Sequence, residues 1–310
     1  MRQFGDFSLL AYSEINRVRW DECVSSSVNS LVYATSWYLD TVTNQSWQAI
    51  IYGDYEFVMP LPVRRKFGIN YLPTPPFVQQ LGVFGPQAAD EELCNAFVQI
   101  ALKIVPFIEL NFNWMNTFKD EPKFQISTRT NLILNLNLSY EQIQSGYSEN
   151  LIRNIRKAEK AGIRFNSTSV RSVIQLFRED RGATLPVATS DWYNTLDQLY
   201  NVAALRKRGA CFGAYDPNGI LVAGMFVIEW QGRSTFLFSG NSASGKNSGA
   251  LPALIDDYIK NHRQNALIFD FEGSDDAGLR RFYESFGAVE SNYVHLKVNQ
   301  LPFYMRWLKS

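Results

Sequence analysis

Histidine and cysteine are scarce in this chain. Its 310 residues include two histidines, His262 and His295, and three cysteines, Cys23, Cys94 and Cys211. No metal-ligand spacing exists among so few, and a Ser-His-Asp or Cys-His catalytic site would have to use one of the two histidines. An odd, scattered set of cysteines favours a reducing compartment. We therefore expect a cytoplasmic protein without a metal.

Long hydrophobic runs and net charge are also missing. The longest uninterrupted apolar run, residues 220–228, is about half of what a membrane span requires, and the N-terminal segment lacks the apolar core of a signal peptide. Lys plus Arg and Asp plus Glu number 30 each, which argues against a surface built as a whole to bind nucleic acid. We expect no membrane span.

Each half of the chain predicts the same order of elements, namely a β-hairpin, a helix and a strand. Corresponding turn residues, Asp54 and Asp216, lie 162 positions apart, which favours a degenerate tandem duplication over chance similarity. The predicted elements are residues 47–65, 89–105 and 107–113 in the first half and 211–230, 251–263 and 267–273 in the second, with a strand at 233–241 and a small-residue loop at 242–250.

A helical linker is predicted between the halves, over residues 139–165. Ser139 with Gln142 has the pattern of a capping box, and Gly162 has the pattern of a helix stop. From residue 151 to 182 there are eight basic residues against three acids. Such a run is usually a solvated face. The alternative is a site for phosphate groups on an acceptor or an RNA, and Arg153, Arg156 and Lys157 are its candidate substrate-binding residues.

The segment 267–288 carries the clearest chemical pattern. It predicts a strand, a Gly-Ser turn, an acidic helix start and an amphipathic helix that ends at Gly287. Alternation along the strand puts Asp270 and Glu272 on one face and Phe269 and Phe271 on the other. Two acids on one face of an apolar strand indicate either a solvated edge strand or a functional site.

This segment resembles a family. Residues 282–288, FYESFGA, resemble the Tyr-x-x-x-Gly signature that closes the last conserved helix of GNAT N-acyltransferases. Residues 269–287 are similar to the corresponding block of Fem-type peptidoglycan aminoacyl-transferases and their bacterial GNAT relatives. Residues 151–165 resemble the basic linker helix that joins the two GNAT-like halves of Fem-type proteins.

The resemblance implies an α/β fold with mixed sheets, arranged as two tandem GNAT-like domains. Residues 1–145 are then a degenerate N-terminal domain, and residues 146–310 are the domain with the donor site. Packing of the last residues against the first domain is an alternative within this division. It also implies that Tyr283 protonates the departing CoA thiolate. A phenol and a thiol differ in pKa by about 1.5 units, so that transfer is uphill by only about 2 kcal/mol. The alternative is that Tyr283 is a half-buried aromatic residue of the helix with a structural role only.

Two departures from the family patterns bear on the donor. Fem-type proteins commonly carry a lysine where this chain has Tyr283, which favours a CoA-using GNAT. The usual Asn-x-x-Ala before the tyrosine begins here with Asp276, a departure that places an acid where the family has an amide.

GNAT proteins bind the CoA pyrophosphate with backbone amides of a Gly-rich loop that opens a helix. The positive end of a helix and its unpaired amides suit an anion. In this chain the loop before the helix contains a cation and small residues, but their spacing differs from that of the family motif. The predicted cofactor-binding residues are Lys246, Asn247, Ser248, Gly249 and Ala250.

A general base is needed to take the proton from the attacking ammonium. Glu229, Asp270 and Glu272 are candidates, and Glu272 is preferred because a Gly-Ser turn follows it at the end of the strand. A structural role is the alternative for each.

We therefore expect a bacterial N-acyltransferase that moves an acyl group from acetyl-CoA, or another acyl-CoA as co-substrate, to a small-molecule or peptide amine. The alternative is a Fem-type ligase that takes an amino acid from aminoacyl-tRNA onto a peptidoglycan precursor. A third option is a non-catalytic binding module, since a fold does not fix a function.

Overall fold

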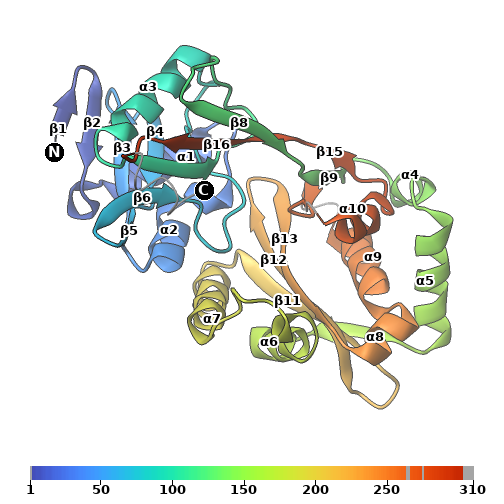
Figure 1. The fold of residues 1–310 in the computed structure, drawn as a ribbon. Helices are drawn as coiled ribbons and strands as arrows, with labels where there is room; N and C mark the ends of the chain where they lie inside the picture. The colour runs from blue at the N-terminus through green and yellow to red at the C-terminus, as the bar shows by residue number, and fades with distance from the viewer. Residues whose placement is uncertain (1, 263–265, 274–275, 303–310) are drawn as a thin grey trace. The chain divides into compact units, whose positions relative to one another are not determined.

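The computed structural model describes residues 2–262, 266–273 and 276–302, which form two compact units (Figure 1). Unit 1 contains the described residues up to Arg129 and from Asn292 onward, and unit 2 contains those from Thr130 to Ser291. The sequence predicted a division after residue 145. The units divide elsewhere because residues 132–135 pair with a strand of unit 2, while residues 293–299 pair with strands of unit 1.

Unit 1 contains an antiparallel sheet and a mixed sheet. Residues 47–65 form the predicted hairpin, in which Gln48 lies opposite Leu61. The antiparallel sheet has the order β1 (Arg2–Phe4), β2 (Phe7–Leu10), β3 (Gln48–Tyr52) and β4 (Phe57–Leu61), and the mixed sheet has the order β5 (Arg64–Lys66), β6 (Ile69–Pro73), β7 (Phe107–Asn111), β16 (Tyr293–Asn299) and β8 (Phe124–Arg129).

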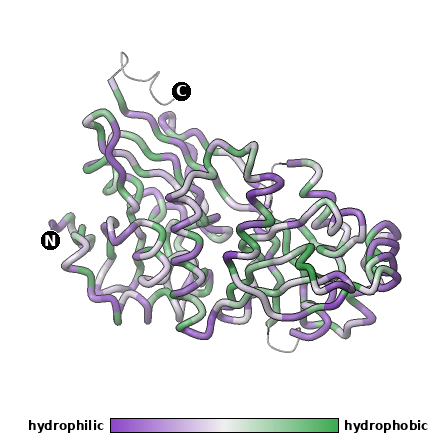
Figure 2. The backbone as a smooth tube through the Cα atoms, turned by 90° about the horizontal axis from the view of Figure 1, so that it is seen from below, coloured by the Kyte–Doolittle hydropathy of each residue, from purple (hydrophilic) through white to green (hydrophobic). Residues whose placement is uncertain are grey.

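Two described α-helices of unit 1, at residues 17–26 and 91–102, begin at side-chain caps and bury apolar residues. Asp90 accepts a hydrogen bond from the amide of Leu93 at 2.8 Å and thereby caps the predicted amphipathic helix, which buries Phe97 and Ala101. Figure 2 shows hydrophilic and hydrophobic residues interspersed along the backbone of the chain. The helical elements are η1 (Tyr12–Glu14), α1 (Arg17–Ser26), η2 (Val32–Ala34), α2 (Ser36–Thr43) and α3 (Glu91–Leu102).

Unit 2 is built around a mixed sheet. The predicted hairpin at 211–230 is present, and Asp216 closes its turn by accepting from the amides of Asn218 and Ile220 at 2.9 Å. The strand order is β10 (Arg164–Ser167), β11 (Gly209–Tyr215), β12 (Leu221–Trp230), β13 (Arg233–Asn241), β14 (Ile268–Asp270), β9 (Leu132–Asn135) and β15 (Val289–Glu290).

Helices cover both faces of this sheet (Figure 1). Helices α6 and α7 contact β11, α9 contacts β11 and β12 from the other face, and α5 packs against α9. The capping box of Ser139 with Gln142 is confirmed, and two helices rather than one follow it before Gly162. The helical elements are α4 (Tyr140–Ser145), α5 (Glu149–Lys160), α6 (Val170–Glu179), η3 (Arg181–Ala183), α7 (Ser190–Leu205), α8 (Ala243–Ser248), α9 (Ala250–His262) and α10 (Ala277–Glu284).

One local prediction for unit 2 was wrong, and one of two alternatives is excluded. The predicted loop at 242–250 contains helix α8, because Ser242 caps it by accepting from the amide of Gly245 at 3.0 Å. The alternative of a solvated edge strand for Asp270 is excluded, because β14 lies between β13 and β9. Within the part of the chain that the structure describes, none of the helices is long and apolar enough to cross a membrane.

Candidate functional site

The candidate site lies in unit 2, where two parallel strands separate. Strands β13 and β14 pair from Arg233 with Ile268 to Thr235 with Asp270, and β13 then continues to Asn241 paired with β12. A cavity of about 470 Å³ lies beside the part of β13 that extends beyond its pairing with β14. Crevices at the carboxyl ends of parallel strands are common ligand sites in α/β proteins. We call this space the strand cavity, and among the residues that line it are Phe236, Gly240, Lys246, Asp276, Leu279 and Tyr283.

Tyr283 lies on α10 and forms part of the wall of the strand cavity, but its side chain is largely buried, with 8% exposed. Its ring stacks on that of Phe271, with centroids 4.9 Å apart. Burial, and next the charge of Glu272, raise the pKa of Tyr283 far above its ordinary value. The phenol is therefore neutral throughout the physiological pH range and can donate a proton or a hydrogen bond.

Glu272 follows β14 in a conformation that is unfavourable for a side chain. Its backbone has φ of 56°, and its amide donates to the Asp270 carboxylate at 2.9 Å. Gly273 follows at a close approach, since a Cβ there would lie 1.9 Å from the carbonyl oxygen of Thr130. A non-glycine residue in the left-handed region is uncommon and costs about 1–3 kcal/mol. The fold therefore fixes this turn tightly beside Tyr283.

The other two base candidates have structural partners. Asp270 is fully buried and accepts from the Arg233 guanidinium at 2.6 Å. Glu229 accepts from the hydroxyl of Tyr258 at 2.9 Å. Asp270 is therefore part of a buried structural ion pair, and Glu272 stays the preferred candidate for the base.

Helix α8 changes the interpretation of the predicted pyrophosphate loop. The amide of Lys246 donates to the carbonyl of Ser242 at 2.9 Å, and the amide of Gly249 donates to carbonyls of the same helix. These amides are used within the helix, so they do not form the expected anion-binding loop. Of the five predicted residues, Lys246 and Gly249 line the strand cavity, while Asn247, Ser248 and Ala250 are not among its described lining residues.

Gly249 has a packing role. Its φ of 74° ends α8 in a left-handed conformation, and a Cβ there would lie 2.4 Å from the carbonyl oxygen of Asn154 on α5. This glycine therefore allows α5 to approach the junction of α8 and α9.

Two ion pairs lie at the strand cavity, and both involve the segment that follows α6. Lys246 pairs with Asp180 at 2.6 Å, and Arg181 pairs with Asp276 at 3.7 Å. The amides of Leu279 and Gly278, together with the nearby arginines, hold the pKa of Asp276 below its ordinary value. Each cation at the cavity thus has an acidic neighbour. The partners of these ion pairs are 66 and 95 positions apart in the chain. No pattern in the sequence indicates contacts over such separations, so the pairs were not predicted.

The predicted substrate-binding residues of α5 do not join the strand cavity. Arg153, Arg156 and Lys157 are exposed, and the described lining of the cavity includes instead their neighbour Asn154. Arg153 donates to the side chain of Asn150 at 3.2 Å. The basic face of α5 is therefore a separate surface of unit 2.

The cysteines and histidines make local structural contacts. All three cysteines are buried, and burial raises the pKa of Cys23 to about 11 and those of Cys94 and Cys211 to about 12. His262 stacks on the ring of Tyr258, with centroids 4.2 Å apart. Among the described residues, no cluster of three or more His, Cys, Asp or Glu side chains is arranged to hold a metal ion.

No protein-family model and no curated protein matches this chain. Several solved structures are similar to it in fold. The crystal structure of FemX has a TM-score of 0.69 at 13% identity, over 97% of this chain and 99% of that chain. A tandem GNAT protein from the clavulanic acid biosynthesis pathway has a TM-score of 0.55 at 13% identity, over 96% and 98%. The C-terminal domain of a putative lysylphosphatidylglycerol synthetase from Agrobacterium fabrum has a TM-score of 0.57 at 10% identity, over 96% and 95%.

These similarities confirm the predicted fold class. The chain has a mixed α/β fold of two tandem GNAT-like domains, related to the fold of FemX. At identities of 10–13% the likeness establishes architecture, while the reaction must be argued from the site itself.

Proposed function

We propose that this chain is an N-acyltransferase that moves an acyl group, acetyl in the first instance, from acyl-CoA to a primary amine of a small molecule or peptide. One observation carries the proposal: the strand cavity opens where β13 and β14 separate, and Tyr283 forms part of its wall. The fold supports it, because a tandem GNAT protein has the same architecture.

In the proposed reaction the amine nitrogen bonds to the acyl carbon, and the bond between that carbon and sulfur breaks. The leaving thiolate gains a proton, and the ammonium that forms loses one. Tyr283 is the proposed acid and Glu272 the proposed base. The raised pKa of Tyr283 makes full proton transfer to sulfur more uphill than the ~2 kcal/mol expected of an unperturbed phenol. The phenol therefore acts chiefly by donating a hydrogen bond as negative charge develops on sulfur.

The two ends of the strand cavity suit this donor unequally. The aromatic end, with Phe236 and Tyr283, is apolar and suits a thioester. At the charged end, Lys246 and Arg181 are the cations available for the pyrophosphate, yet Asp180 and Asp276 already neutralise them. Binding of a pyrophosphate thus requires that these ion pairs open or tolerate a second anion.

One observation favours a second donor. Because the amides of Lys246 and Gly249 are used within α8, they do not supply the donors predicted for a CoA pyrophosphate, and an aminoacyl ester of tRNA does not need those donors. The exposed cations of α5, Arg153, Arg156 and Lys157, would then contact RNA phosphates. The acceptor under this alternative is a peptidoglycan precursor.

Donor binding to the full-length chain tests the proposal. Acetyl-CoA at 100 times its dissociation constant stabilises a folded protein by about 2.7 kcal/mol, which corresponds to a rise in Tm of roughly 5–10 °C. We expect this rise, and we expect Lys246→Glu to reduce it because a like charge then faces the pyrophosphate. No response to acetyl-CoA together with salt-sensitive binding of aminoacyl-tRNA would favour the second donor. Absence of both responses would indicate a non-catalytic binding module.

A further inference from the structure

Unit 1 contains a groove that the proposed reaction does not use. Two cavities, of about 600 Å³ and 620 Å³, adjoin because Ala11, Gln48 and Asn70 line both of them. We call the two together the basic groove. The side chains of Gln48 and Asn70 make no hydrogen bond with other described residues, so their amide donors are available at its centre.

The basic groove carries an excess of positive charge. Its described lining includes four cations, Arg64 and Arg65 in one cavity and Arg2 and Lys103 in the other. Within the described chain, Arg2 and Arg64 make no ion pair. The Arg65 guanidinium donates only to the carbonyl of Gly68, at 3.4 Å. Cations without acidic neighbours produce a positive potential that attracts anions.

Glu14 is the acid among the described residues that line the basic groove. Its carboxylate accepts from the amide of Ala11 at 2.8 Å, an interaction that helps to hold its pKa below the ordinary value. One acid leaves the groove with three positive charges in excess.

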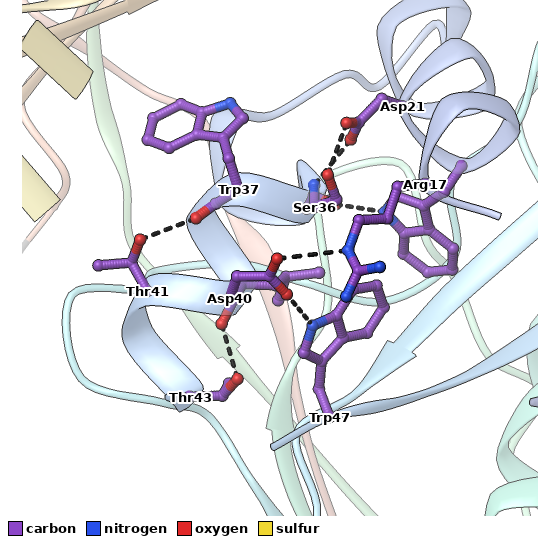
Figure 3. Close-up of polar contacts among 11 residues, drawn as sticks. Arg17, Asp21, Ser36, Trp37, Asp40, Thr41, Thr43 and Trp47 are labelled. Carbon is purple, nitrogen blue, oxygen red and sulfur yellow. Dashed lines mark hydrogen bonds and ion pairs between the residues drawn. The ribbon is translucent and has the colours of Figure 1, made fainter. Parts of the chain in front are cut away.

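The aromatic wall of the groove is fixed in advance. Tyr12 and Trp47 line one cavity, with ring centroids 6.2 Å apart. Asp40 accepts from the indole nitrogen of Trp47 at 2.8 Å and from Nε of Arg17 at 3.4 Å, as Figure 3 shows. The Arg17 guanidinium lies 4.4 Å from the centroid of Tyr12. Because Asp40 neutralises Arg17, that arginine orients the wall and adds nothing to the excess charge.

We propose that the basic groove binds a small molecule that carries two or more phosphate groups. Arg64 and Arg65 are able to bind one phosphate, since the guanidinium fork matches phosphate oxygens in a bidentate manner. Arg2 and Lys103 bind a second, and Gln48 donates between them. The same chemistry is offered by an inorganic polyphosphate and by a nucleotide, and the base of a nucleotide would also contact Tyr12.

Calorimetric titration of the full-length chain at low salt tests this proposal with inorganic triphosphate and ADP as probes. We expect at least one probe to bind with a micromolar dissociation constant that rises as salt is added. The double substitution Arg64→Gln with Arg65→Gln should weaken binding by about tenfold or more, because two charge-assisted hydrogen bonds are lost. Lys103→Gln, at the other cavity, should weaken it as well. If ADP binds more tightly than triphosphate and Tyr12→Leu removes this preference, the natural ligand is a nucleotide. If both probes bind equally well, the natural ligand is a polyphosphate.

The matched control is Lys123→Gln, which removes an exposed cation of unit 1 that is not among the described residues lining the groove. Dissociation constants above 1 mM for both probes would overturn the proposal, as would an equal weakening by the control. Because CoA itself carries phosphates, acetyl-CoA is titrated into the same variants. If the strand cavity and the basic groove are separate sites, Arg64→Gln with Arg65→Gln weakens triphosphate binding and leaves acetyl-CoA binding unchanged.

Discussion

The strand cavity of unit 2 and the basic groove of unit 1 are both lined by cations, but they differ in how those cations are neutralised. At the strand cavity, Lys246 faces Asp180 and Arg181 faces Asp276. In the basic groove, Arg2 and Arg64 have no acidic partner within the described residues. A chain with as many acids as bases can therefore hold a strongly positive site, because pairing in space, and not total charge, decides the local potential.

Substitution of Tyr283, at the aromatic end of the strand cavity, should have the largest effect of the substitutions considered. If Tyr283 supports departure of the thiolate, Tyr283→Phe should lower kcat by about 10²–10⁴ while acetyl-CoA affinity stays nearly constant. The measurement is steady-state kinetics with an amine acceptor found by screening. Unchanged turnover in this variant would remove Tyr283 from the mechanism. The groove variants Arg64→Gln with Arg65→Gln serve as the control and should retain kcat.

The buried ion pair behind the strand cavity should give the next largest effect. Asp270→Ala leaves the Arg233 guanidinium without its carboxylate and should lower the free energy of unfolding by about 3–5 kcal/mol. Urea denaturation measures this loss. Replacing both partners, as Arg233→Met with Asp270→Leu, should recover much of the stability, because no unpaired charge then remains. A double variant that is as unstable as the single one would show that the pair is not the cause.

Opening one ion pair should make the strand cavity resemble the basic groove. Asp180→Asn removes the acid beside Lys246 and should tighten binding of acetyl-CoA by about three- to tenfold, given the typical size of a half-exposed charge interaction. The same substitution should leave triphosphate binding at the basic groove unaffected. Isothermal titration measures both constants. Weaker acetyl-CoA binding would mean that Asp180 positions Lys246 rather than competing for it.

The smallest effect concerns a buried acid of unit 2 that lies away from both sites. Asp256 accepts from the hydroxyls of Tyr140 and Tyr147 at 2.9 Å, and burial nevertheless raises its pKa. Its contribution to stability is then complete below the unfolded pKa of about 3.9 and is lost as the pH rises through the folded pKa.

Asp256→Asn keeps an acceptor for both tyrosines and removes the titration. The stability of this variant relative to the parent should therefore increase from pH 4 to pH 7, by about 1.4 kcal/mol for each unit by which the pKa is raised. Denaturation at the two pH values tests the sign. A relative stability that falls over this range would show that the tyrosines outweigh burial.

Much of the fold could be predicted because its patterns are local. The hairpin around Asp216 is closed by the side chain of that residue, and helix α3 begins at Asp90, which caps it. The prediction failed at residues 242–250, since small residues are typical of loops while a serine cap and a left-handed glycine also permit a short helix. In the structure Ser242 caps this helix, and Gly249 ends it in a left-handed conformation close to Asn154 of α5.

The candidate site was predicted in part. A motif led to Tyr283, and the structure places its side chain on a cavity wall. The same reasoning gave no indication that Asp180 would neutralise Lys246, or that Asp270 would be buried beside Arg233. Each of these pairs joins residues that are far apart in the chain, and a single sequence contains no periodicity that connects them.

The sequence by itself therefore determined the order of strands and helices, the tandem organisation and the position of the tyrosine, because hydrophobic periodicity, caps and short motifs act over a few neighbouring residues. Only the tertiary structure decided where charge is neutralised and where it remains. Ion pairing and burial depend on distances between segments far apart in the chain, which arise once the sheets form. For this reason the cations at the strand cavity are neutralised in the folded protein, while the basic groove keeps an excess of positive charge.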